Sequence, residues 1–225
     1  FMRLTRYAHL APSAESQGLP QPPLEVPCPP DARLVDLPRP ADVRLPGADL
    51  AQMIVQRRSL RRYSAEALSL EELAYLLWLT QGVKKVTDRP VTFRTAPSAG
   101  ARHAFETYLL INRVEGLAPG LYRYMALKHQ LALLNEQPGI TAAVTHAAHD
   151  QRMIEISAVT FIWVAVLERM YWRYGERGYR YLHLDAGHVC QNLYLAAESI
   201  GCGAVAIAAY DDELMNATLG LDGES

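Results

Sequence analysis

The chain contains 225 residues, of which half are hydrophobic and 20% are charged, and its formal net charge is −2. A chain of this size and composition is long enough to bury the core of one large soluble domain. Its nearly neutral charge argues against a nucleic-acid or anionic-membrane binder, because such proteins carry a basic excess. The sequence contains no run of about 18 apolar residues, so no membrane span is predicted. The three scattered cysteines form no CxxC pair and no secretory pattern begins the chain, so we expect a reducing, cytoplasmic setting.

Proline dominates the first segment of the chain. Ten of the 14 prolines lie between Pro12 and Pro46. Proline fixes φ and donates no backbone hydrogen bond, so this segment is predicted to be extended rather than helical. Two interpretations remain open: a disordered leader, or an arm that lies over a core or a partner subunit, which its scattered leucines and valines favour. We therefore divide the chain into a Pro-rich N-terminal arm at residues 1–48 and a folded domain at residues 49–225.

Capping patterns predict the first two helices of the domain. Asp49 followed by Gln52 resembles a capping box, and apolar residues at helical spacing come directly after it. Ser69 and Glu72 form a second capping box, and Gly82 is a typical C-terminal stop for the helix that follows.

The remaining pattern mixes helices and strands. Helices are predicted at residues 140–149, from a cap at Asp185 to Ile200, and from a cap at Asp211 or Asp212 to Gly220. Strands are predicted at residues 105–114, 120–125, 130–134 and 204–208, with the second and third forming a hairpin. The apolar run at 159–167 fits a strand, or alternatively part of a helix over 154–170. Because the elements do not alternate strictly, the predicted fold class is α+β.

The strongest chemical signal is R-R-S-L-R at residues 57–61. Several guanidiniums beside a hydroxyl suit a phosphate, because arginine forks match phosphate oxygens in a bidentate manner. Arginine also stabilises negative charge that develops on a conjugated ring. The alternative interpretation is a solvated basic turn with no ligand.

Two other segments are rich in small residues, A-P-S-A-G-A at 96–101 and G-C-G-A-V-A-I-A-A-Y-D-D at 201–212. Small side chains let a backbone approach a flat ligand closely. Each segment alone equally fits an ordinary turn or connection. Two histidine pairs, His146 with His149 and His183 with His188, lack a third ligand, so no metal site is predicted.

Taken in order, these segments resemble the nitroreductase family, and more closely its SagB-type dehydrogenases. The resemblance covers roughly residues 50–220. It is carried by R-R-S-L-R-R-Y, L-S-L-E-E-L-A-Y-L-L-W followed by Q-G, A-P-S-A-G-A-R-H, P-G-L-Y-R-Y, Y-G-E-R-G-Y-R and D-A-G-H-V-C-Q-N-L-Y-L-A-A. It implies a nitroreductase-like fold, with a mixed central sheet flanked by helices, and an intertwined homodimer that binds FMN at its interface.

The resemblance also implies roles for named residues. Arg57 and Ser59, with Arg58 beside them, match positions that hold the FMN phosphate and ribityl chain, and Arg61 matches the basic residue near flavin N1 and O2. The loop that covers the flavin from the other subunit corresponds to Pro97, Ser98, Ala99 and Gly100. The backbone turn near flavin N5 corresponds to Ala208 and Ala209. Many family members carry a Glu-Gly pair at that turn, so only backbone contacts carry over.

Two further departures from the family pattern concern the chain end and a catalytic pair. Relatives continue past L-G-L-D-G-E into a strand that ends with a basic residue on the phosphate, whereas this chain ends at Ser225. That contact is expected to be missing or supplied by another arginine. Azoline-oxidising relatives carry a Lys-Tyr pair that falls at Arg173 and Tyr174. Arginine keeps its charge, so Tyr174 is the candidate catalytic donor or acceptor.

The expected function is an FMN-dependent oxidoreductase that transfers hydride through flavin N5, from NAD(P)H to a nitro-aromatic or quinone acceptor. One alternative is oxidation of a peptide azoline ring with dioxygen as electron acceptor. A second is a flavin-binding scaffold subunit without turnover, and a third is a surface turn that binds no flavin. The expected partners are a second copy of the chain and a small-molecule or peptide substrate, with neither nucleic acid nor membrane.

Overall fold

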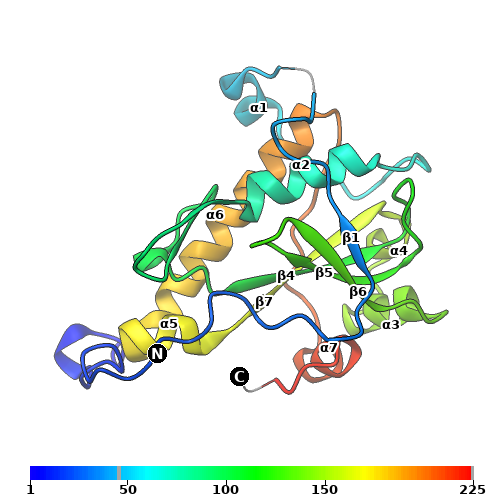
Figure 1. The fold of residues 1–225 in the computed structure, drawn as a ribbon. Helices are drawn as coiled ribbons and strands as arrows, with labels where there is room; N and C mark the ends of the chain where they lie inside the picture. Colours follow the sequence, from blue (N-terminus) through cyan, green and yellow to red (C-terminus); the bar gives the residue numbers. More distant parts are fainter. Residues whose placement is uncertain (45–46, 224–225) are drawn as a thin grey trace.

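The computed structural model describes residues 1–44 and 47–223. Pro46 of the Pro-rich segment and the chain end at Ser225 therefore lie outside the described residues. The centre of the fold is a five-stranded antiparallel sheet with the order β1-β6-β5-β4-β7 (Figure 1). Its strands are β1 (Leu34–Asp36), β4 (Phe105–Ile111), β5 (Gly120–Met125), β6 (Gln130–Asn135) and β7 (Val159–Ala165). A separate hairpin joins β2 (Val83–Val86) to β3 (Thr92–Arg94).

Helices cover both faces of this sheet. Helices α2 and α6 lie on one face, whereas α3, α4 and α7 lie on the other (Figure 1). The α-helices are α1 (Leu50–Gln56), α2 (Leu70–Gln81), α3 (Ile140–Ala147), α4 (Met153–Ile156), α5 (Leu167–Tyr174), α6 (Gly178–Ser199) and α7 (Asp212–Leu219). Within the described residues, no helix combines the length and the apolar character needed to cross a membrane. The predicted α+β class and nitroreductase-like arrangement are confirmed.

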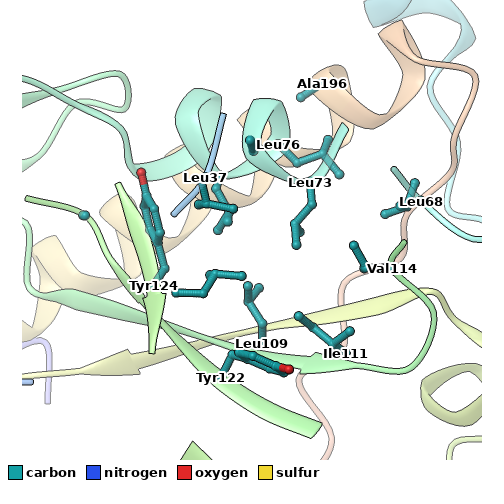
Figure 2. Close-up of a cluster of buried hydrophobic side chains, with 14 of the residues drawn as sticks. Leu37, Leu68, Leu73, Leu76, Leu109, Ile111, Val114, Tyr122, Tyr124 and Ala196 are labelled. Atoms are coloured by element: carbon teal, nitrogen blue, oxygen red, sulfur yellow. The ribbon is translucent and has the colours of Figure 1, made fainter. Parts of the chain in front are cut away.

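Alternation along the inner strand β4 explains the layers. Leu109 and Ile111 face the α2 side, where they join a buried cluster with Leu73 and other residues of α2 (Figure 2). Their neighbours Tyr108 and Leu110 join clusters with the helices of the opposite face. Successive side chains of a strand point to opposite faces, and all seven residues of β4 are buried, so this strand is covered on both sides.

The predicted helix ends are largely confirmed. The carboxylate of Asp49 accepts a hydrogen bond from the Gln52 N–H, 2.9 Å away, and caps α1. Both halves of the Ser69–Glu72 capping box are present at α2. At α7, the Asp211 carboxylate caps the helix start. The hairpin of β5 and β6 is also confirmed.

The predicted start of the long helix at Asp185 is wrong. Helix α6 begins seven residues earlier, at Gly178, and Asp185 is a buried residue in its middle. The helix start has no side-chain cap, because Arg177 makes no capping hydrogen bond. A sequence pattern that depends on caps could not locate this end.

The structure also confirms one strand expectation and corrects another. The run at 159–167 forms strand β7, so the alternative helix over 154–170 is wrong. The segment 204–208 is not a buried strand: it is half-exposed to exposed, and Ala204 makes a single bridge with Ser59. A short apolar run reads as a strand, but only a neighbouring backbone provides the ladder that makes one.

The Pro-rich segment lies along the domain in this structure (Figure 1). Strand β1 pairs with β6 at the sheet edge, through the register Leu34 to Ala132. Further upstream, buried arginines of the domain donate to backbone carbonyls of the segment. Arg169 donates to Pro23, 2.8 Å away, and Arg123 donates to Pro27, 2.7 Å away. These bonds satisfy carbonyls in a segment whose prolines provide few backbone donors. The division at residue 48 stays a prediction.

An ion pair between Arg169 and Glu106 lies beneath this segment. Their side chains are 4% and 6% exposed, and Glu106 also accepts a hydrogen bond from the Val26 N–H, 2.9 Å away. Removing one partner of a buried pair leaves an uncompensated charge, which is more costly than the pair itself is stabilising.

Glu106→Gln is therefore expected to lower the free energy of unfolding by about 3–5 kcal/mol, the usual loss for a broken buried pair. Urea denaturation at neutral pH measures it. The matched control is Glu136→Gln, which removes an exposed pair with Arg33 and should change stability by less than about 1 kcal/mol. Equal effects of the two substitutions would contradict the buried pair.

Candidate functional site

The basic turn at 57–61 lies directly after α1. Arg57 is half-exposed, and its guanidinium carbon lies 5.1 Å from the centroid of the Tyr194 ring. The Ser59 hydroxyl lies 3.1 Å from the Tyr194 hydroxyl. Arg58 and Arg61 are exposed. Three guanidiniums and a hydroxyl on one short turn provide the donors that a phosphate accepts.

Tyr194 of α6 joins this turn to the segment at 204–209. Its hydroxyl accepts a hydrogen bond from the Ala206 N–H at 2.8 Å, and the Leu60 N–H donates to the Ala204 carbonyl at 3.0 Å. A Cβ at Gly203 would overlap the Leu60 side chain, so glycine permits this close approach. Ala208 and Ala209 follow on an exposed stretch, where the Ala209 carbonyl accepts from Gln151 at 2.9 Å.

The loop that contains Pro97, Ser98, Ala99 and Gly100 is held by side chains. The Ala99 N–H donates to the Asp185 carboxylate at 3.3 Å, and the Ser98 hydroxyl accepts from the His103 N–H at 2.9 Å. Pro97 is exposed. Gly100, Ala101 and His103 have φ values of 57°, 54° and 44°. Left-handed backbone at non-glycine residues costs free energy and persists only where surrounding contacts hold it.

Arg173 and Tyr174 pack directly on this loop. A Cβ at Gly100 would lie 2.5 Å from the Tyr174 hydroxyl and 2.8 Å from Arg173 Cδ. The Tyr174 ring also meets Tyr181 edge-on, with centroids 4.7 Å apart. The structure therefore brings together the loop and the candidate pair, which the sequence pattern identified separately.

The two groups of predicted residues remain apart in one chain. Tyr194 anchors the basic turn, and Asp185 anchors the loop at Gly100; both belong to α6. Nine residues of α-helix separate them, which is about 13 Å along the axis. Within the described chain, residues 57–61 and 97–100 therefore do not meet.

Tyr194 and Asp185 are site residues that the sequence reasoning missed. Both lie in D-A-G-H-V-C-Q-N-L-Y-L-A-A, a segment that carries the family resemblance but for which the resemblance implied no residue roles. Burial raises the pKa of the Asp185 carboxyl, and the hydrogen bond from the Ala99 backbone partly opposes this. No local pattern marks either residue, because each acts on a segment that is distant in sequence.

The cysteines and the two histidine pairs are the remaining residues that the sequence analysis considered. Burial raises the pKa of Cys190 and of Cys202, which favours the neutral thiol over a nucleophilic thiolate. In residues 1–44 and 47–223, no three histidine, cysteine or acidic side chains gather closely enough to hold a metal ion. His146 instead lies 3.2 Å from Asp150 on the surface.

Gly100→Ala is expected to destabilise the protein by about 2–4 kcal/mol, from left-handed strain and the forced shift of Tyr174. Gly116→Ala is the matched control, since Gly116 also has positive φ, 77°, but no atom within 4 Å of an added Cβ. The control should lose only the strain, about 1–2 kcal/mol. Urea denaturation of both variants measures the difference, and equal losses would refute the contact between Gly100 and Tyr174.

His103 makes stability depend on acid. Burial, and next the positive charge of Arg94, lower its pKa from 6.5 to about 3. Between these values the unfolded chain binds a proton that the native protein does not, so stability rises with pH there. From pH 6 to pH 4, His103 should contribute a loss of about 1.4 kcal/mol per unit of acidification. His103→Asn should remove this dependence of stability on pH, and asparagine tolerates the left-handed backbone at this position. Urea denaturation at several pH values measures it, and equal pH dependence of the variant and the wild type would refute the role of His103.

Comparison with known proteins identifies relatives of this arrangement. The nitroreductase family matches residues 54–225. A nitroreductase homologue from Methanocaldococcus jannaschii is 38% identical over 178 residues, which cover 77% of this chain and 87% of that protein. The trifolitoxin-processing protein TfxB of Rhizobium leguminosarum is 28% identical over 133 residues, which cover 57% of this chain and 36% of that protein.

Solved structures share the fold. A nitroreductase homologue from Ralstonia eutropha has a TM-score of 0.69 at 26% identity and covers 91% of this chain and 92% of its own. One from Anabaena variabilis has a TM-score of 0.65 at 29% identity, with coverage of 77% and 35%, so this chain spans about a third of its length. An FMN complex from Desulfovibrio desulfuricans has a TM-score of 0.54 at 22% identity, with 79% of each chain covered. From the family match and the archaeal relative, this chain belongs to the nitroreductase family.

Proposed function

We propose that the protein is an FMN-dependent oxidoreductase of the SagB-type branch. The observation that carries this proposal is the basic turn at 57–61, whose guanidiniums stand open to solvent beside Tyr194 and the backbone of residues 204–209. An open set of arginine donors is the chemistry that binds a phosphate ester. Family membership adds weight, and the Desulfovibrio relative is a complex with FMN.

The residues present fit an FMN molecule. Arg57, Arg58 and Ser59 would hold its phosphate and ribityl chain, and Arg61 would lie near the ring edge where negative charge develops. Ala208 and Ala209 are exposed and carry only methyl side chains, so their backbone N–H groups would be available to the ring. When bound, the flavin would supply hydride transfer at its N5 atom, while the protein supplies positioning and electrostatics.

Tyr174 is the proposed proton donor or acceptor for the substrate. Its hydroxyl lies against Gly100 of the covering loop, and its ring is fixed by Tyr181. Fixed orientation is what a general acid or base needs before its pKa matters. Arg173 contributes charge at the same place rather than proton transfer, because a guanidinium does not deprotonate at physiological pH.

A homodimer would bring the two separated groups together. Helix α1 has no buried residue, and its Leu50, Ile54 and Val55 are 64%, 53% and 83% exposed. On α6, Leu184 is 58% exposed. Apolar surface of this kind marks an interface. In a pair of chains, the loop at 97–100 of one subunit would cover the flavin held by residues 57–61 of the other.

The proposed substrates are NAD(P)H as hydride donor and a nitro-aromatic or quinone as acceptor, in a cytoplasmic setting. The second candidate is oxidation of a peptide azoline ring, which the similarity to trifolitoxin-processing protein TfxB favours. The arginine at position 173 weighs against a proton-transfer role for that residue in this reaction. A flavin-binding scaffold without turnover is the remaining alternative.

The spectrum of the purified protein tests the cofactor. After addition of FMN and desalting, wild-type protein should retain flavin absorption bands, whereas Arg57→Ala/Arg61→Ala should lose most of them, because each charge-assisted contact with the phosphate or the ring contributes about 1.5–3 kcal/mol. The control, Arg39→Ala/Arg152→Ala, removes the same charge at two other exposed positions and should resemble wild type. Flavin lost equally from all three proteins would sink the proposal.

Turnover then separates the candidates. Oxidation of NADPH with reduction of a nitro-aromatic supports the reductase. Oxidation of a thiazoline peptide with oxygen consumption supports the azoline dehydrogenase. Retained flavin that no donor reduces supports the scaffold.

A further inference from the structure

Two guanidiniums meet one carboxylate beside Tyr174, and a third guanidinium contacts the same glycine as Arg173. Glu15 Oε1 lies 2.6 Å from Arg173 Nη1 and 3.0 Å from Arg89 Nη2. Arg102 is 5% exposed, its guanidinium lies over the Trp172 ring at 5.3 Å, and it donates to the Gly100 carbonyl at 3.0 Å. Among the described residues, no acidic side chain forms an ion pair with Arg102.

This cluster carries an excess of positive charge. Burial, and next the charge of Arg173, lower the pKa of Arg102, whereas Glu15 opposes the shift. Arginine nevertheless stays protonated. Three positive charges therefore face one negative charge, and the two remaining charges favour an anion. Guanidinium forks match the paired oxygens of carboxylates and phosphates.

Glu15 reaches the arginines from a distant part of the chain. Its backbone is held without its carboxylate: the Glu15 N–H donates to the Trp172 carbonyl at 2.8 Å, and Trp172 Nε1 donates to the Leu19 carbonyl at 2.9 Å. The side chains of Glu15 and Arg173 are each 28% exposed, so an ion from solvent reaches them. The carboxylate is thus a replaceable partner of the arginines on a segment that other bonds keep in place.

We propose that Arg89, Arg102 and Arg173 form a recognition site for an oxyanion of the substrate, and that Glu15 fills this site until the substrate binds. The assignment to substrate rests on the proposed function, because Arg173 and Tyr174 contact the same glycine of the loop expected to cover the flavin. The ligand is a small molecule that carries a carboxylate or a phosphate. Glu15 competes with that group as an intramolecular mimic, and neutral analogues gain nothing from the site.

Isothermal titration calorimetry tests the site by measuring binding affinity, without turnover. The probes are 4-nitrobenzoate and its neutral analogue 4-nitrobenzamide, at constant ionic strength, with FMN-supplemented protein. Glu15→Gln should bind the benzoate about fivefold more tightly, the effect of removing one partly exposed competing charge. Arg173→Gln should bind it about fivefold more weakly. The amide should not respond to either substitution, and Glu136→Gln, which neutralises a remote exposed carboxylate, should match wild type.

A second pair of probes, NADP⁺ and NAD⁺, separates the two sources of oxyanion. Tighter binding of 4-nitrobenzoate to Glu15→Gln assigns the site to a substrate carboxylate. Tighter binding of NADP⁺ alone, with no change for NAD⁺ or 4-nitrobenzoate, assigns the site to the phosphate that distinguishes the two nucleotides. Unchanged affinity of Glu15→Gln for both anions would overturn the proposal. Flavin retained by the same proteins after desalting keeps the results distinct: loss of flavin counts against the proposed function, while the titrations still report on the arginines.

Discussion

The packing of α6 against α2 and one face of the sheet is the constraint on which the candidate site depends. Helix α6 has 22 residues, about 33 Å of rigid helix. Its buried Ala196 and Ala197 join the main core with α2 and the inner strands. Because this contact fixes the helix, Asp185 and Tyr194 stand at fixed points along it. Two loops that are remote in sequence are anchored at those points.

Arginine serves three different purposes in this chain, and the burial and the acceptors of each guanidinium distinguish them. Arg123 and Arg169 are buried and bind carbonyls of the Pro-rich segment, where the prolines leave acceptors without matching donors. Arg57 and its neighbours on the basic turn stand open to solvent. Around Glu15, Arg102 is buried, whereas Arg89 is exposed and Arg173 is half-exposed, and the last two share one carboxylate. The net charge of the chain is close to zero and does not reveal these three groups. They differ because each guanidinium finds its acceptors in a different place.

The Pro-rich segment links the fold to the site. Its middle is bonded to buried arginines, and Glu15 near its start reaches the pair Arg173–Tyr174. Removing polar backbone from water requires compensating bonds, and the arginines of the domain supply them. A separate backbone hydrogen bond, from the Glu15 N–H to the Trp172 carbonyl, holds Glu15 beside this pair. The exposed apolar surface of α1 is a separate feature, and a second subunit is the proposed cover for it.

Local signals in the sequence were sufficient for much of the fold. The caps at Asp49 and Ser69, the hairpin of β5 and β6, and the end of α7 depend on side chains within a few residues of one another. The basic turn was also identified from sequence, because its arginines are adjacent to one another in the chain. The family followed from the order of several motifs and is confirmed.

Long-range contacts were decided only by the tertiary structure. The start of α6 lacks a capping residue, so the predicted helix began seven residues late. The backbone at 204–208 lacks a strand neighbour, so the predicted strand does not form. The contact of Gly100 with Tyr174, and that of Glu15 with Arg173, join residues 74 and 158 positions apart. Such contacts leave no periodicity or spacing in the sequence, because they form only when packed elements bring distant side chains within reach.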